Sequence, residues 1–334
     1  MADKIYFFNE ASSMLMSINL KEHDSNVLRI KNITQYRKVP IDYVKMVGNS
    51  IYGLEMSGEY MLRYDMTSAE IEYIKIDCND KLDGNFAFID SDDTYIYIFT
   101  RQQGLVMYNY HKKTIYREKY PICNMRAAAV CKCGGNYVVF QNDSNVVTEY
   151  IPESGKWKNK NIEAKLNNIS QAVYNKQNFY IICGDGLIII WNEQNNITYV
   201  DAVKKIYNSS NAASRICVTE DNYIIMPSAG EDILILDRDL STVKKYMDYP
   251  SDFRYADNNW AKYNMYSEDD EKYLFSCRKS QYIACVSKKD GKITWEKSEV
   301  DITERDIFNY ETSDVKKEKN NYLNYFIEDV VDKI

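Results

Sequence analysis

Residues 136–157, NYVVFQNDSNVVTEYIPESGKW, contain an apolar strand, a short turn, a second apolar strand, a polar turn and the start of a third strand. The same pattern occurs seven times in the 334 residues. The last apolar residue before each polar turn marks the repeat, and these markers recur every 41 to 50 residues: Ile18, Tyr64, Tyr108, Tyr150, Trp191, Leu236 and Val286. An all-strand period of this length predicts a repeat architecture.

A further short segment precedes six of the seven copies and is separated from them by turn-prone residues: 43–47, 86–89, 127–131, 171–174, 215–218 and 263–266. The repeating unit is therefore four antiparallel strands, with the innermost strand first. One such sheet cannot bury both of its faces, whereas stacking the sheets in a closed ring covers them. We predict an all-β fold, a seven-bladed β-propeller over residues 1–312.

The two ends of the chain depart from the repeat. Lys4 already begins the second strand of the first copy, so this copy lacks an inner strand. Residues 306–310, DIFNY, predict a closing strand that returns to the first blade, with 300–303 as the alternative. Residues 316–334 carry apolar side chains at helical spacing and predict a C-terminal amphipathic α-helix. This helix either packs on the propeller or docks another protein.

Composition and charge restrict the partners. The formal net charge is −7, whereas nucleic acid or an anionic membrane would require a basic surface, so we expect neither as a partner. No apolar stretch approaches the roughly 18 residues of a membrane span, and no signal peptide follows Met1. Most of the eight cysteines lie in apolar strand runs, where a thiol behaves as a small apolar group. We expect a cytoplasmic monomer.

The hairpins between the third and fourth strands resemble known propeller repeats. Residues 64–67 (YDMT), 150–157 (YIPESGKW) and 286–295 (VSKKDGKITW) resemble kelch and PQQ-type repeats. The double glycine of kelch repeats occurs only at Gly134–Gly135, after the inner strand instead of in its usual place, and the Trp-Asp dipeptide of WD repeats is absent. The resemblance implies the propeller superfold, no specific family and no quinone cofactor.

Few residue patterns point to catalysis. The only histidines, His23 and His111, lie in outer hairpins, which argues against a histidine triad or a multi-histidine metal site. Cys131 and Cys133 are too closely spaced for a zinc knuckle or a redox pair. Acidic pairs such as Asp92–Asp93 lie in turns, where they favour turn formation, although paired-acid chemistry stays open. We expect no metal and no cofactor.

A propeller binds ligands where the loops that enter the inner strands meet the loops between the second and third strands. These loops carry four arginines: Arg101, Arg126, Arg215 and Arg278. The longest insertion, residues 248–260, adds four aromatic residues and a fifth arginine: Tyr249, Phe253, Tyr255, Trp260 and Arg254. Arginine and aromatic residues are the usual anchors of a recognition surface. The alternative is that the aromatic residues plug the channel mouth or cover a blade edge, and that the arginines pair with acids of this chain.

Two functions follow from these loops. The first is a non-enzymatic cytoplasmic binding or scaffold propeller, which recognises a protein or peptide through its loop face around Arg254, Tyr255 and Trp260. The alternative is a propeller enzyme, a lyase or hydrolase, that acts on an anionic small molecule or sugar. An enzyme would need a cluster of acids or tyrosines with shifted pKa values in the channel mouth. An open pocket with two or more buried carboxylates near Arg126 and Arg215 would favour catalysis, whereas a flat or plugged face would favour protein recognition. The scarcity of histidine favours binding.

Overall fold

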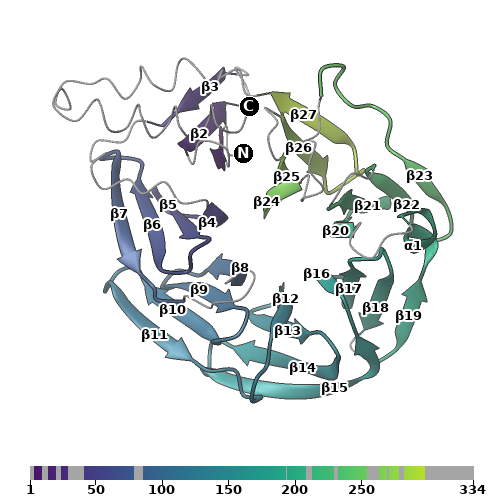
Figure 1. Ribbon diagram of the computed structural model, residues 1–334, viewed down its shortest axis with the longest axis horizontal. Helices are drawn as coiled ribbons and strands as arrows, with labels where there is room; N and C mark the ends of the chain where they lie inside the picture. The colour runs from purple at the N-terminus through teal and green to yellow at the C-terminus, as the bar shows by residue number, and fades with distance from the viewer. Residues whose placement is uncertain are drawn as a thin grey trace, which may run out of the picture.

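The chain is a β-propeller, in which sheets radiate from a central axis (Figure 1). The computed structural model describes residues 4–9, 14–19, 24–28, 41–78, 86–192, 194–207, 213–228, 232–253, 263–268, 271–277 and 282–297. These residues form six four-stranded sheets and one three-stranded sheet, all with antiparallel neighbours. The four-stranded sheets are numbered blade 1 to blade 6 in chain order.

The first half of the ring begins with the three-stranded sheet, which comprises β1 (Lys4–Asn9), β2 (Met14–Asn19) and β3 (Asp24–Val27). Blade 1 comprises β4 (Ile41–Val47), β5 (Ser50–Glu55), β6 (Tyr60–Asp65) and β7 (Glu70–Lys75). Blade 2 comprises β8 (Phe86–Ser91), β9 (Tyr95–Thr100), β10 (Leu105–Asn109) and β11 (Thr114–Glu118). Blade 3 comprises β12 (Ala127–Cys133), β13 (Asn136–Gln141), β14 (Ser144–Ile151) and β15 (Lys156–Leu166).

The second half of the ring has the same strand order and includes one short helix. Blade 4 comprises β16 (Ile169–Asn175), β17 (Asn178–Cys183), β18 (Ile188–Asn192) and β19 (Ile197–Val200), and α1 (Ala202–Tyr207) follows it. Blade 5 comprises β20 (Ala213–Val218), β21 (Asn222–Pro227), β22 (Leu234–Asp237) and β23 (Val243–Lys245). Blade 6 comprises β24 (Tyr263–Glu268), β25 (Lys272–Cys277), β26 (Tyr282–Ser287) and β27 (Ile293–Lys297).

The predicted strand pattern of the blades is confirmed. Each of the six predicted innermost segments lies in the first strand of a blade, which is β4, β8, β12, β16, β20 or β24. The repeat markers of the six blades lie on the third strands, and none of their side chains is more than 3% exposed. An apolar residue at this position is therefore what packs one blade against its neighbour.

The predicted number of seven blades is wrong, because the described chain forms six. Along the axis, the inner strand β24 of blade 6 contacts the inner strand β4 of blade 1. Among the described residues, the three-stranded sheet β1–β3 has no inner strand, and it lies between these two blades in Figure 1. The repeat in the sequence has the same length whether or not its strands reach the axis. The first repeat was therefore counted as a seventh blade, although it forms the three-stranded sheet.

The predicted elements at the C-terminal end cannot be placed. The closing strand at 306–310, its alternative at 300–303 and the amphipathic helix over 316–334 all lie outside the described residues. Among the residues that are described, α1 is the only helix, and its six residues are too few to cross a membrane.

The hydrophobic core is divided into layers between neighbouring sheets. Between blades 3 and 4, for example, Phe140 on β13 and Phe179 on β17 lie with their ring centroids 5.8 Å apart. Similar layers join the other consecutive blades, and Leu15 on β2 packs in a layer with residues of blade 1. Burying one large apolar side chain contributes about 1.5–3 kcal/mol, so each interface holds several such contributions. The inner strands are thereby fixed around the axis.

Candidate functional site

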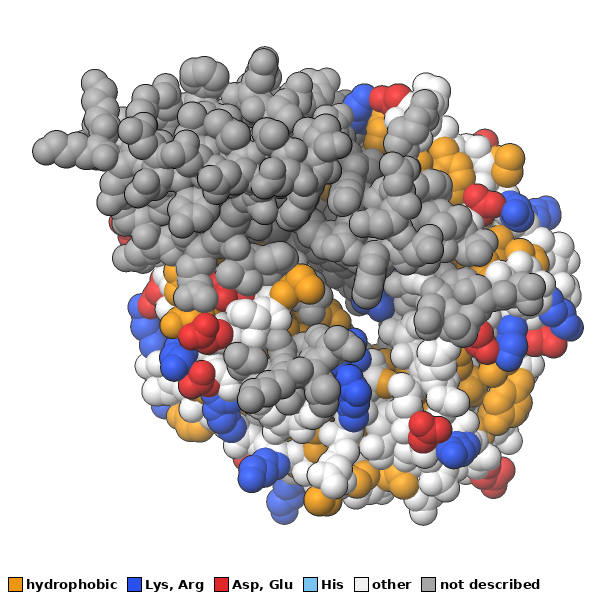
Figure 2. Space-filling model, viewed as in Figure 1, with side chains coloured by type: hydrophobic (Ala, Val, Ile, Leu, Met, Phe, Trp, Pro, Cys, Tyr) orange, Lys and Arg blue, Asp and Glu red, His pale blue; other side chains and the backbone are white. Residues whose placement is uncertain are grey.

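The inner strands surround a cavity of about 430 Å³ on the axis, a volume typical of ligand sites in proteins. Its wall comes from β4, β8, β12, β16 and β20, together with β25 and adjoining turns. Among the described residues, five basic side chains line it, against the single carboxylate of Glu220: Arg101, Lys132, Lys176, Arg215 and Lys288. Figure 2 shows basic side chains beside the central opening. The axis is therefore locally basic in a chain of net charge −7.

A β-bulge recurs near the start of five inner strands and shapes one end of the cavity. The pairing register shifts at the second residue of β4, β8, β12, β16 and β20. A bulge leaves its extra residue outside the ladder, so its carbonyl must find another donor. In β8, Tyr43 of blade 1 supplies it, because its hydroxyl donates to the carbonyl of Ala87 at 3.1 Å.

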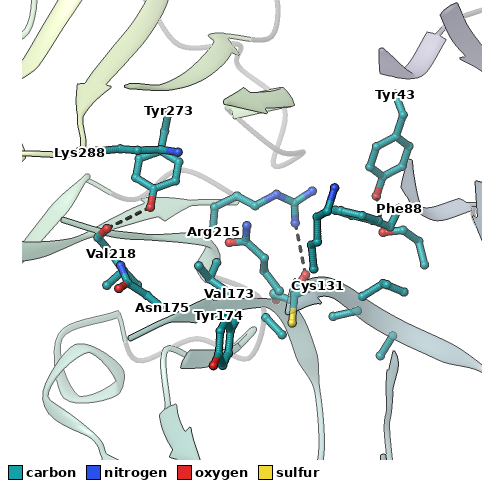
Figure 3. A pocket seen from close by; sticks show the side chains of 18 of the residues that line it. Tyr43, Phe88, Cys131, Val173, Tyr174, Asn175, Arg215, Val218, Tyr273 and Lys288 are labelled. Atoms are coloured by element: carbon teal, nitrogen blue, oxygen red, sulfur yellow. Dashed lines mark hydrogen bonds between the residues drawn. The ribbon is translucent and has the colours of Figure 1, made fainter. Parts of the chain in front are cut away.

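In the next two blades, an arginine side chain donates to the carbonyls at the bulge. The Arg101 guanidinium lies 3.4 Å from the carbonyls of Ala127 and Ala128 at the start of β12. The Arg215 guanidinium donates to the carbonyl of Ser170, the bulge residue of β16, at 3.2 Å. In Figure 3 the Arg215 side chain extends into the space between Tyr43 and Tyr273. Bulge geometry thus explains why both arginines point to the axis.

These contacts leave the positive charge of both arginines unneutralised. Their partners are backbone carbonyls, which carry no net charge, and neither arginine has a carboxylate partner among the described residues. Both side chains are half-buried, and a guanidinium has more N–H donors than these contacts use. An anion in the cavity would gain charge-assisted hydrogen bonds from either residue.

The turn that carries Arg101 depends on Gly104. The Gly104 carbonyl accepts hydrogen bonds from the Thr100 amide and hydroxyl, both at 2.9 Å, and the Thr100 hydroxyl accepts one from the Gln103 amide at 2.9 Å. Gly104 has φ +111°, and a Cβ added there would lie 2.1 Å from the backbone oxygen of Glu118. Only glycine fits this turn without moving β11 or the arginine.

We therefore expect Gly104→Ala to lower the free energy of unfolding by about 3 kcal/mol, from backbone strain and the clash with β11. Gly135→Ala is the matched control, because Gly135 also lies in a turn but nothing is within 4 Å of its added Cβ. Denaturant titration of both variants checks this. Equal midpoints for the two variants would show that the turn accommodates a side chain.

The opposite end of the cavity is built around lysines. Asp90 on β8 is 5% exposed and forms ion pairs of 2.6 Å with both Lys45 on β4 and Lys132 on β12. The Tyr137 hydroxyl donates to the same carboxylate at 3.0 Å. Burial would raise the pKa of Asp90, but the two lysines outweigh it, and the pKa lies below its usual range. Asp90 therefore stays ionised and joins three neighbouring inner strands.

The remaining two lysines at this end come from other blades. The Lys288 ammonium lies over the Tyr273 ring at 4.9 Å, and the backbone carbonyl of Lys288 accepts a hydrogen bond from the Glu220 amide at 3.0 Å. Tyr273 and Lys288 lie together on one side of the pocket in Figure 3, across from Tyr43 and Phe88. Lys176 is exposed in the turn after β16.

The predicted site residues have different locations. Arg101 and Arg215 both line the cavity, whereas Arg126 is exposed and does not line it. Phe253 is 7% exposed and packs on Trp295 at 4.9 Å and on Tyr249 at 5.5 Å, as in the alternative in which the insertion covers a blade edge. Four predicted residues lie outside the described residues: Arg254, Tyr255, Trp260 and Arg278.

The sequence analysis missed the lysine end of the cavity. Lys132, Lys176 and Lys288 lie at or near the ends of strands, where lysines normally face solvent. For Lys132 and Lys176 the available signal was the predicted inner strands themselves, because a basic residue at the end of an inner strand must lie near the axis. Lys288 follows β26, the third strand of blade 6, and has no such signal. The structure also places no group of three or more potential metal ligands within the part of the chain that it describes.

No family model matches the chain, and no curated protein matches it. Among solved structures, virginiamycin B lyase from Staphylococcus aureus is similar, with a TM-score of 0.62 and 12% identity over 83% of this chain and 89% of that chain. PorZ, a surface component of the type-IX secretion system of Porphyromonas gingivalis, has a TM-score of 0.60 and 11% identity over 90% of this chain. This chain spans 37% of PorZ.

A computationally designed protein, Ika8, is also similar, with a TM-score of 0.55 and 7% identity over 89% of this chain and 81% of that chain. Identities this low establish a shared propeller fold and nothing about ligands or activity. The site must therefore be interpreted from its own residues.

Proposed function

We propose that the protein is a non-enzymatic binding propeller, which recognises a protein or peptide by seating an acidic side chain at the loop end of the axial cavity. The observation that carries this proposal is the pair Arg101 and Arg215. Both line the cavity, both are half-buried, and both have only backbone carbonyls as partners among the described residues.

A carboxylate suits this end of the cavity for two reasons. The planar guanidinium matches the geometry of a carboxylate and pairs with it through parallel hydrogen bonds. The neighbouring wall is formed by small apolar residues, such as Ala128 and Ala172, which leave room for the aliphatic part of an acidic side chain. Two cations at one site also offset the cost of removing a carboxylate from water.

The charge distribution favours binding over catalysis. General acid–base chemistry most often uses a histidine or a carboxylate with a shifted pKa, and paired-acid chemistry needs two carboxylates. Of the described residues that line the cavity, Glu220 alone carries a carboxylate, and it belongs to the lysine end. The lyase from Staphylococcus aureus shares only the fold with this chain, at 12% identity. This likeness gives no reason to expect the activity of the lyase in this cavity.

We also propose that the protein acts in the cytoplasm. The support is that seven of the eight cysteines of the chain are free thiols, and five of these seven are buried. A secreted protein with this many cysteines would more often have paired them.

The test is binding of a labelled peptide that contains two glutamates, compared with the same peptide carrying glutamines, by fluorescence anisotropy. We expect the double variant Arg101→Gln/Arg215→Gln to bind the glutamate peptide about tenfold more weakly than the wild type, because charge-assisted hydrogen bonds are lost. Arg126→Gln is the control, since it removes the same charge from an exposed residue near the cavity.

Binding of the glutamate peptide should also weaken as salt is added. If the double variant and the Arg126→Gln control bind equally well, or if the glutamine peptide binds as tightly as the glutamate peptide, the cavity arginines are not the recognition site. Thermal unfolding of each variant confirms that a change in affinity is not a loss of fold.

A further inference from the structure

The cavity has basic residues at both of its ends. Arg101 and Arg215 contact the first residues of β12 and β16. Lys132 and Lys176 come at the end of these same two strands, or just after it. The inner strands run along the axis, so the arginines and the lysines lie at opposite ends of one cavity, whose wall includes all four residues.

The separation of the two ends follows from strand geometry. Four residues of β12 separate Ala128, beside Arg101, from Lys132, which corresponds to about 13 Å at the rise of a β-strand. Between the two ends, the wall includes small side chains on β12 and β16, such as Ala129 and Ala172, beside the polar side chain of Gln171. A ligand that uses both ends must therefore be elongated, with an anionic group near each end.

The lysine end keeps positive charge for such a ligand. Asp90 is shared between Lys45 and Lys132, so one carboxylate serves two ammonium groups. Lys176 is exposed and has no ion-pair partner among the described residues. Glu220 is the acid that lines this end, together with Lys132, Lys176 and Lys288. Among the described residues that line the cavity, the balance of charge at this end is positive, as it is at the arginine end.

We propose that the cavity holds an extended acidic segment whose two acidic side chains lie about four residues apart, with one at Arg101 and Arg215 and the other at Lys132 and Lys176. This inference rests on the proposed function and specifies its ligand. Four residues of extended chain span the same length as the four residues of β12, and residues four apart in such a chain point to the same side.

The test uses two labelled peptides of nine residues with identical composition and blocked ends. In the spaced peptide, two glutamates are separated by three serine or glycine residues, and in the adjacent peptide the glutamates are neighbours. We expect the wild type to bind the spaced peptide about fivefold more tightly, because only this peptide places a carboxylate at each end. Lys176→Gln should abolish this preference, because it removes a cation from the lysine end without disturbing Asp90.

Lys158→Gln is the matched control, since Lys158 is an exposed lysine on β15, away from the axis, and its loss should leave the preference intact. Equal affinity for the two peptides, with both still weakened by Arg101→Gln/Arg215→Gln, would overturn the spanning ligand and leave the proposed function standing. Affinities that do not depend on the two arginines would overturn both. A preference that survives Lys176→Gln would place the second carboxylate elsewhere and likewise overturn this inference.

Discussion

Trp191→Ala is expected to lower the free energy of unfolding by about 4 kcal/mol, the largest effect of any single substitution considered for this protein. Trp191 on β18 is 3% exposed and stacks on Phe179, with 4.7 Å between the ring centroids. Phe140 in blade 3 packs against it edge-to-face, with 6.3 Å between the ring centroids. Its indole N–H donates to Asn195 at 3.0 Å. Alanine would leave a cavity between two blades and an amide oxygen without its donor.

Tyr199→Ala is the control for this substitution. Tyr199 lies on the next strand of the same blade but is 56% exposed, so its removal should change stability by less than about 0.5 kcal/mol. Denaturant unfolding followed by circular dichroism measures both variants. A loss below about 1 kcal/mol for Trp191→Ala would mean that contacts between blades contribute much less than their burial indicates.

Asp90→Asn is expected to cost about 2 kcal/mol at neutral pH, because it leaves Lys45 and Lys132 without their shared carboxylate. The side chains of these lysines are 35% and 47% exposed, so water relieves part of the cost, and the loss is smaller than for a fully buried ion pair. Asparagine has the same shape and still accepts the hydrogen bond from Tyr137, so the change is confined to charge.

The effect of Asp90→Asn on stability should depend on pH, and the direction follows from the lowered pKa of Asp90. The pKa of Asp90 is lower in the folded protein than in the unfolded chain, so its contribution to stability is complete above the unfolded pKa of about 3.9 and is lost as the pH falls below it. The difference in stability between wild type and Asp90→Asn should be constant from about pH 5 to 8 and shrink below about pH 4. Asp93→Asn, a substitution of an exposed neighbour, is the control and should change stability by less than about 0.5 kcal/mol at neutral pH.

Periodicity was sufficient to predict most of the fold. Alternating apolar residues around markers such as Tyr108 and Leu236 predict the strands of each blade, because the same residues must be buried between two sheets. The number of blades was not predictable in this way. Whether the first repeat reaches the axis depends on the contact between β4 and β24, which are more than 200 residues apart in the sequence and share no local pattern.

The candidate site was predictable only in part, and the reason is physical. Arg101 and Arg215 lie in loops that propeller topology brings together, so their approach to the axis could be anticipated. The bulges at Ala128 and Ser170, which hold these arginines in place, are shifts of register that no sequence pattern marks. Lys132 and Lys176 resemble ordinary turn residues until the inner strands are placed.

The bulges also explain how a basic cavity arises in an acidic protein. Each bulge carbonyl requires a donor, and an arginine supplies one while keeping its charge, whereas Tyr43 supplies one without any charge. Replacing Arg215 by a neutral donor would satisfy the same carbonyl. The fold therefore does not require the positive charge of Arg215, and this is our argument that the charge binds a ligand.

The most direct test of this account is a crystal structure of the protein with the spaced two-glutamate peptide at low salt. The account predicts that the peptide lies along the axis, with one carboxylate within hydrogen-bonding distance of the guanidinium groups of Arg101 and Arg215. A peptide held by the exposed lysines of β15, with the cavity arginines still bound only to backbone carbonyls, would contradict it.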